Sequence, residues 1–108
     1  MRILGVLMVF AAAGQAFADG LPGDPAAGLS FARDHCAECH YVEDEWSGVS
    51  PYNAPAFHDI AQEPRWTPLS LRVFLRTPHQ NLLMPDFILT DAEADDVISH
   101  ILSLRKAD

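Results

Sequence analysis

The chain has 108 residues, of which 15 are acidic and 7 are basic, and its formal net charge is −8. This length allows a single domain. The negative charge argues against a nucleic acid partner and against an anionic membrane surface, because both would repel the protein.

The first eighteen residues have the features of an export signal. A short basic start, Met1–Arg2, precedes an apolar run, Ile3–Ala13, that is too short to cross a bilayer as a permanent helix. The run ends before Ala16–Ala18, which has the small-x-small pattern cut by signal peptidase. We therefore expect residues 1–18 to be a cleaved secretory signal peptide; an uncleaved anchor or a buried core helix is the competing interpretation.

Cleavage would leave residues 19–108 as the one domain and would remove one basic residue, which changes the formal charge from −8 to −9. We expect the mature protein in the periplasm of a bacterium, with no stable membrane insertion after cleavage.

Two helices are predicted from an N-cap residue followed by proline at the first helical position. Asp24–Pro25 begins a helix that runs to about His35. Thr67–Pro68 begins a second helix, which Thr77–Pro78 ends, because proline disfavours helical conformation in the residue before it.

A third helix begins at Thr90–Glu93, a capping box, and carries apolar residues from Val97 to Leu104 at largely helical spacing. The stretches 47–64 and 79–89 are predicted to be loops, and the first contains three prolines and no alternating strand pattern. Such long loops in a compact chain are typical of segments that wrap something, and a large apolar cofactor would complete the small core.

The stretch HCAECHY, residues 35–41, contains both cysteines of the chain. A zinc site needs four ligands arranged as a tetrahedron, and the six consecutive residues from His35 to His40 can hardly surround one ion. A thioredoxin-like dithiol needs an adjacent βαβ pattern, which is absent. The third interpretation is covalent haem attachment, for which Cys-x-x-Cys-His is the recognised signature.

Cys36 and Cys39 would lie on about one helical turn, so each thiol could form a thioether with one haem vinyl group. His40 would then be held beneath the macrocycle as an axial iron ligand. We predict one covalently attached haem c.

The sixth iron ligand is predicted to be Met84, the only methionine left after signal cleavage. Pro85 follows it and favours an extended conformation from which the sulfur can reach the iron. The alternative for Met84 is a gap-filling core side chain. The rival ligands are histidines: His79 first, and then His35, His58 and His100.

The chain resembles the class I c-type cytochromes over essentially all of residues 19–108. The order of features carries the resemblance: a first helix leading into Cys36–His40, a loop, a middle helix, Met84–Pro85 and a closing helix. The stretches SPYNAPAF and LRVFLRTPH…LMPDFILT are similar to small bacterial members. The resemblance implies an all-α, small cytochrome c fold, with three main helices and long loops wrapped around one haem.

The resemblance also implies roles for single residues. Gly28 and Phe31 on the first helix should face Val97–Ile101 across a close helix crossing. His100 stands where the family usually has a large aromatic, so the crossing is expected to be less stable or to gain a hydrogen bond. The carbonyl of Pro51 should accept the ring N–H of His40.

The indole of Trp66 should contact a haem propionate. Ordinary loop packing is the alternative for both Pro51 and Trp66.

We therefore predict a soluble monohaem electron carrier and not an enzyme. Its redox partners should have a basic docking face, and we expect a monomer. The acidic residues near the attachment motif are Asp34, Glu38, Glu43, Asp44 and Glu45. Two alternatives remain open: a haem sensor or peroxidase-like protein with an open or displaceable sixth position, and a small copper-binding or metal-handling protein that uses the sulfur residues without haem.

Overall fold

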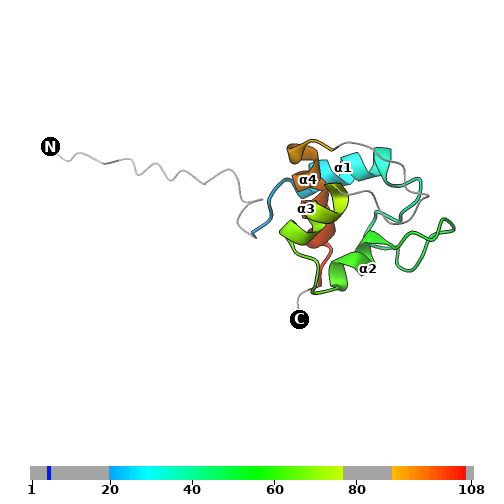
Figure 1. The fold of residues 1–108 in the computed structure, drawn as a ribbon. Coiled ribbons are helices and arrows are strands. Elements are labelled where there is room, and N and C mark those ends of the chain that lie inside the picture. Colours follow the sequence, from blue (N-terminus) through cyan, green and yellow to red (C-terminus); the bar gives the residue numbers. More distant parts are fainter. Residues whose placement is uncertain (1–4, 6–19, 77–88, 107–108) are drawn as a thin grey trace.

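The computed structural model describes residue 5, residues 20–76 and residues 89–106. These residues form four α-helices: α1 (Pro25–His35), α2 (Phe57–Gln62), α3 (Pro68–Arg76) and α4 (Asp91–Ser103) (Figure 1). No strand occurs in the described ranges, where one isolated bridge joins Val49 to Pro55. The predicted all-α class is confirmed. The predicted signal peptide and the segment with His79, Met84 and Pro85 lie outside the described residues.

The three predicted helices begin where their capping residues indicated. The carboxylate of Asp24 accepts a hydrogen bond from the backbone N–H of Ala26 at 2.9 Å, at the start of α1. The hydroxyl of Thr67 accepts one from the N–H of Ser70 at 3.1 Å, at the start of α3. Thr90 forms both bonds of the predicted capping box of α4. These caps satisfy N–H groups that a helix start leaves without partners.

The helix α2 lies in the stretch 47–64 that was predicted to be a loop, so the count of three main helices is corrected to four in the described residues. It has no side-chain cap, but Phe57 is 4% exposed and Ala61 is fully buried. Its stability therefore comes from packing against the rest of the molecule rather than from local capping.

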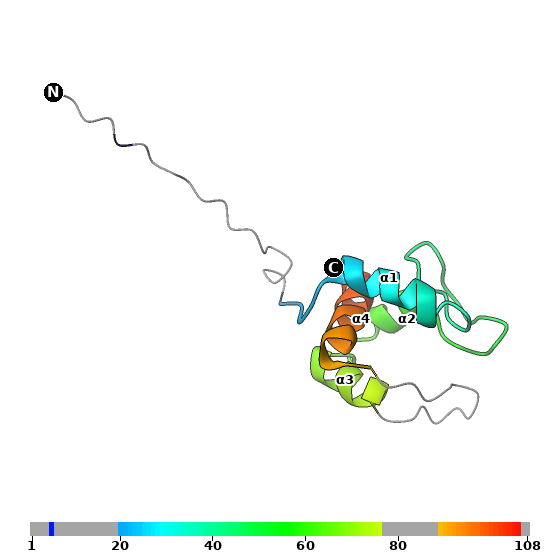
Figure 2. The same cartoon turned by 90° about the horizontal axis from the view of Figure 1, so that it is seen from above.

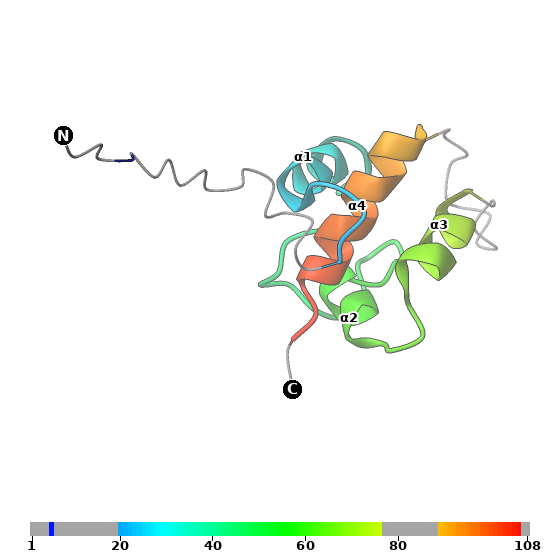
Figure 3. The same cartoon turned by 90° about the vertical axis from the view of Figure 1, so that its left-hand side faces the viewer.

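The helix α4 is the centre of the fold. It contacts α1 most extensively and also contacts α2 and α3. Figures 2 and 3 show α4 between α1 and α3. The buried core residues are Ala32, Val42, Phe57, Ala61, Leu71, Val97, Ile98, Ile101 and Leu104.

The two helices α1 and α4 cross in close contact at Gly28. A Cβ atom added to Gly28 would overlap the carbonyl of Asp96 and lie 3.0 Å from the Cβ of His100. The expected close crossing at Gly28 is therefore confirmed, and Phe31 is partly buried against the core as expected. The segment before α1 is also attached to α4, because the N–H of Gly23 donates to the hydroxyl of Ser99 at 2.7 Å.

Ion pairs and one arginine join the remaining parts to α4. Arg72 and Arg76 of α3 pair with Asp95 and Asp91 of α4. Arg105, just after α4, donates to the carbonyls of Ala61, Glu63 and Trp66 at 2.6, 3.0 and 2.8 Å. These contacts hold α2 and α3 at one side of α4, while the long connection between α1 and α2 extends away from the helices (Figures 1 and 2).

Candidate functional site

The Cys-x-x-Cys-His motif forms a turn that continues the direction of α1. The N–H groups of Cys39 and His40 both donate to the carbonyl of Cys36, at 3.1 and 2.9 Å. Both cysteines are partly buried free thiols. Their backbone lies on one helical turn, as the spacing predicted.

Burial raises the pKa of the Cys36 thiol to about 11. At neutral pH this side chain is therefore protonated, whereas a redox-active dithiol depends on a lowered cysteine pKa and a ready supply of thiolate. The chemistry of this thiol does not favour a thioredoxin-like function.

The imidazole of His40 is held by a single backbone carbonyl. Its Nδ1 lies 2.7 Å from the carbonyl oxygen of Pro55. Because a carbonyl can only accept, Nδ1 carries the proton and the lone pair of Nε2 is left for a metal ion. Burial lowers the pKa of His40 below its ordinary value of 6.5, and the bond to Pro55 opposes this shift. The ring is thus fixed in a neutral, ligating tautomer.

The acceptor for this bond was predicted to be Pro51, and that prediction is wrong. A tight turn follows Ser50: the N–H of Asn53 donates to the Ser50 carbonyl at 2.9 Å, and Asn53 has a φ of 61°. The turn reverses the chain and returns Pro55, not Pro51, to His40, while Pro51 itself is exposed. The sequence did offer a signal for Pro55, because it stands two residues before Phe57, a large apolar residue that is expected to be buried. In the structure Phe57 is buried, and its ring centroid lies 5.3 Å from that of His40.

Trp66 has a buried polar atom without a partner. Among the described residues, no hydrogen-bond acceptor lies near its Nε1. Its ring packs edge-on against Phe74 at 5.2 Å, and the guanidinium of Arg65 lies 4.8 Å from the ring centroid. A buried indole N–H without an acceptor is costly, so this site suits a ligand that brings an acceptor oxygen. A carboxylate beside Trp66 would fit this N–H, and Arg65, which also pairs with Glu63 at 2.6 Å, would supply a second donor.

Apolar side chains are exposed on α3, the helix next to Trp66. Leu69 is 71% exposed and Val73 is 56% exposed, and only Leu71 of this helix is buried. Burying one such side chain is worth about 1.5–3 kcal/mol, so α3 is suited to contact a further apolar surface. The donor set at residues 36–40, the orphan N–H of Trp66 and this apolar face together fit a large planar cofactor that has carboxylates at one edge.

Three of the histidines considered as rival ligands have other partners. His58 Nδ1 lies 3.0 Å from the carboxylate of Asp44, and His100 Nε2 lies 2.7 Å from the carbonyl of Val42. The ring of His35 packs on that of Phe31 at 4.4 Å. His79 and Met84 lie outside the described residues, so the choice between them stays a prediction.

The described residues bring no group of three or more His, Cys, Asp and Glu side chains together as a metal site. In the same part of the chain, no helix is both long and apolar enough to span a membrane.

Two of the acidic residues near the motif have basic partners. Arg33 lies 2.5 Å from Glu43, and Lys106 lies 3.2 Å from Asp44. The hydrogen bond from Arg33 lowers the pKa of Glu43, and hydrogen bonds from His58 and Lys106 lower the pKa of Asp44. The other three acids named from the sequence, Asp34, Glu38 and Glu45, are exposed.

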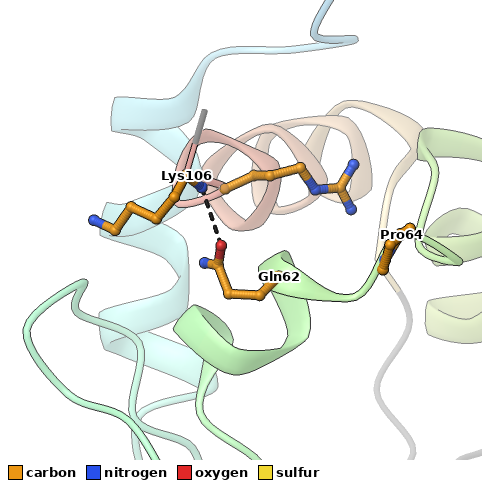
Figure 4. A pocket seen from close by; sticks show the side chains of 4 residues that line it. Gln62, Pro64 and Lys106 are labelled. Atoms are coloured by element: carbon orange, nitrogen blue, oxygen red, sulfur yellow. Dashed lines mark hydrogen bonds between the residues drawn. The ribbon is translucent and has the colours of Figure 1, made fainter. Parts of the chain in front are cut away.

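A shallow pocket of about 400 Å³ lies between α2 and the chain after α4, away from the cysteines (Figure 4). Its wall is a structural contact, because Gln62 accepts from the backbone N–H of Lys106 at 3.0 Å and donates to the carbonyl of Leu104 at 3.0 Å. We assign it no chemical role.

Comparison with known protein families identifies the chain. The family model described as cytochrome c matches residues 25–105, and the chain belongs to this family. Comparisons with curated proteins and with solved structures found no match. The family membership confirms the predicted class I c-type cytochrome and its cofactor, covalently attached haem c, and thus a haem-binding electron-transfer protein.

Proposed function

We propose that this protein is a soluble periplasmic carrier of single electrons, with His40 and Met84 as the axial ligands of one haem. The observation that carries the proposal is the bond between His40 Nδ1 and the carbonyl of Pro55, at 2.7 Å. This bond fixes the tautomer and the plane of the ring, as hydrogen bonds to the free nitrogen of metal-binding histidines generally do. It also makes the imidazole a better electron donor to a metal.

Cys36 and Cys39 are the residues that would hold the porphyrin through thioethers. Haem iron, when bound, supplies a one-electron ferric–ferrous couple. The turn that joins Cys36 to His40 through two backbone hydrogen bonds sets the position of the ligand relative to the two sulfurs. A tether of this kind keeps the ligand in place in both oxidation states.

Met84 is proposed as the second ligand because it is the only methionine after residue 8 and stands directly before Pro85. The contacts of His100 support this choice, because its side chain is 4% exposed and its Nε2 is bonded to the carbonyl of Val42. A thioether ligand raises the reduction potential relative to a second histidine.

Trp66 and Arg65 would bind the carboxylate edge of the cofactor. The indole N–H of Trp66 is buried and has no acceptor among the described residues, and the guanidinium of Arg65 lies 4.8 Å from the centroid of the same ring. A propionate there would accept the N–H bond and be stabilised by the positive charge.

The acidic residues near the attachment turn support a docking surface for a basic redox partner. Asp34, Glu38 and Glu45 are exposed and lie within ten residues of the cysteines in sequence. Association with such a partner should slow as ionic strength rises, because salt screens exposed charges. We propose a monomer that is exported by the signal peptide and meets its partners in brief encounters.

The experiment is an optical spectrum and a redox titration of the protein matured in a host that assembles c-type cytochromes. Met84→Ala should lower the potential, remove the Met–iron charge-transfer band of the ferric protein and let the ferrous protein bind carbon monoxide. His79→Ala is the matched control and should leave all three unchanged.

If His79→Ala changes these three properties and Met84→Ala does not, the second iron ligand is His79 and not Met84. Carbon monoxide binding by the unaltered protein at neutral pH would instead favour the haem sensor or peroxidase-like alternative.

A further inference from the structure

We propose that His100 is a positioning residue that holds the segment of His40 in place through the Val42 carbonyl and the Phe57 ring. The proposal rests on the proposed function, since it takes His40 as the iron ligand. His100 itself lies on α4.

The first contact is a buried hydrogen bond. The side chain of His100 is 4% exposed, and its Nε2 lies 2.7 Å from the carbonyl oxygen of Val42. Because the carbonyl accepts, Nε2 must carry the proton. Val42 is also 4% exposed and follows His40 by two residues. The bond therefore attaches the chain just after the ligand to the central helix.

The second contact passes through an aromatic ring. The ring of Phe57 lies 6.1 Å from that of His100 and 5.3 Å from that of His40. The N–H of Phe57 also donates to the carbonyl of Tyr41 at 2.9 Å, beside the ligand. His100 thus contacts Phe57, whose ring packs beside that of His40 and which follows Pro55 by two positions.

These two contacts hold two backbone segments, residues 40–42 and residues 55–57. The bond between His40 and Pro55 joins the two segments, so a shift of either segment would turn the plane of the His40 imidazole. A phenyl ring at position 100 could fill the same buried volume. A phenyl ring has no hydrogen-bond donor for the Val42 carbonyl, and the Nε2–H donor is the role that we assign to His100.

The location of His100 limits the movement of its side chain. Its Cβ would lie 3.0 Å from a Cβ added at Gly28, so His100 lies beside the close contact between Gly28 of α1 and Asp96 of α4. Little movement of the imidazole is possible at such a contact, because interiors packed at this density transmit displacement instead of absorbing it.

The test compares His100→Phe, which keeps a buried ring and removes the donor, with His100→Gln, which keeps an N–H donor near the position of Nε2. The matched control is Ile101→Val, a buried change on the same helix that does not involve the Val42 carbonyl. His100→Phe and Ile101→Val should each lower the equilibrium constant for folding about tenfold.

The deciding measurements are the haem methyl proton shifts of the ferric protein and its reduction potential. The methyl shifts follow the orientation of the axial imidazole plane, so a structural role alone would not move them. His100→Phe should change the shift pattern and the potential, His100→Gln should restore most of both, and Ile101→Val should leave both unchanged.

An unchanged shift pattern in His100→Phe, with a normal low-spin spectrum in the unaltered protein, would overturn the role of His100 and leave the proposed function intact. A high-spin ferric spectrum of the unaltered protein would count against the proposed function instead. Should His100→Phe fail to mature, the ¹⁵N spectrum of the unaltered holoprotein decides: a slowly exchanging Nε2–H on His100 supports the proposal, and the Nδ1–H tautomer overturns it.

Discussion

The α1–α4 crossing and the α3 region of this protein differ in how they are stabilised. At the crossing, Gly28 lies against the backbone of Asp96, and α4 buries an unbroken run from Val97 to Ile101. In α3 only Leu71 is buried, and Leu69 is 71% exposed. The crossing is completed by the polypeptide itself, whereas α3 and Trp66 have surfaces that fit a bound cofactor. One small chain therefore contains a self-sufficient half and a cofactor-dependent half.

The largest effect should follow from preventing haem attachment with Cys36→Ser and Cys39→Ser together. Without the cofactor, α3 loses the surface that covers it, while α1 and α4 keep their mutual contact. Hydrogen exchange should therefore show residual protection in α1 and α4 and none above the unfolded chain in α3. Equal protection in α3 and α4, or a uniform loss across the chain, would remove the distinction between the two halves.

A large loss of stability is also expected when the crossing itself is overfilled. Gly28→Ala places a methyl group on the carbonyl of Asp96 and forces the two helices apart. The holoprotein should lose about 3 kcal/mol of unfolding free energy, measured by chemical denaturation. Ser30→Ala, at an exposed position on the same helix, serves as the control. A loss below about 0.5 kcal/mol for Gly28→Ala would show that the crossing can relax.

A smaller effect is expected at the cofactor side for Trp66→Phe, which keeps an aromatic ring and removes the indole N–H. The holoprotein should lose about 2 kcal/mol, because a hydrogen bond to a charged propionate is lost. Its reduction potential should also fall, because the propionate charge is less well neutralised. Trp46→Phe is the control, at an indole that is 55% exposed. Equal losses in the holoprotein and the haem-free chain would mean that Trp66 acts by packing alone.

The smallest effect should come from the ion pair that joins the attachment loop to the end of the chain. Hydrogen bonds from His58 and Lys106 lower the pKa of Asp44 from its ordinary value of 3.8. Because the folded pKa is lower than the ordinary one, the stabilisation is fully present above pH 3.8 and is lost as the pH falls through the folded pKa. Thermal unfolding of Asp44→Asn should thus differ from the unaltered protein at neutral pH and converge with it in acid. Asp34→Asn controls for the change in net charge, and a difference independent of pH would exclude the ion pair as its source.

The parts of the fold that follow from local chemistry could be predicted from the sequence. Asp24, Thr67 and Thr90 mark the starts of three helices because each cap is formed within a few residues of its partner. The attachment motif could be predicted for the same reason, since its turn is stabilised by bonds between Cys36 and His40. The close approach at Gly28 was implied only by resemblance to a family.

The parts that depend on distant contacts could not be predicted. The short helix α2 forms because Phe57 and Ala61 are buried, and its own six residues carry no capping signal. The partner of His40 is Pro55 and not Pro51, because the turn at Asn53 reverses the chain and brings the Pro55 carbonyl to His40. The number of residues between His40 and each proline does not reveal this turn. The buried N–H of Trp66, which has no partner in the part of the chain that the structure describes, could not be predicted because its burial depends on distant contacts.

Arg105 has a consequence for protein engineering. Its guanidinium binds one carbonyl of α2 and two of the α2–α3 connection, and Arg105 follows the last residue of α4 by two positions. These bonds join the residues just after α4 to α2 and to the α2–α3 connection, so polypeptide attached after Lys106 need not be ordered for them to form. Fusion of a second redox module or of an electrode-binding tag after Lys106 should accordingly preserve the globule, whereas trimming back past Arg105 should not.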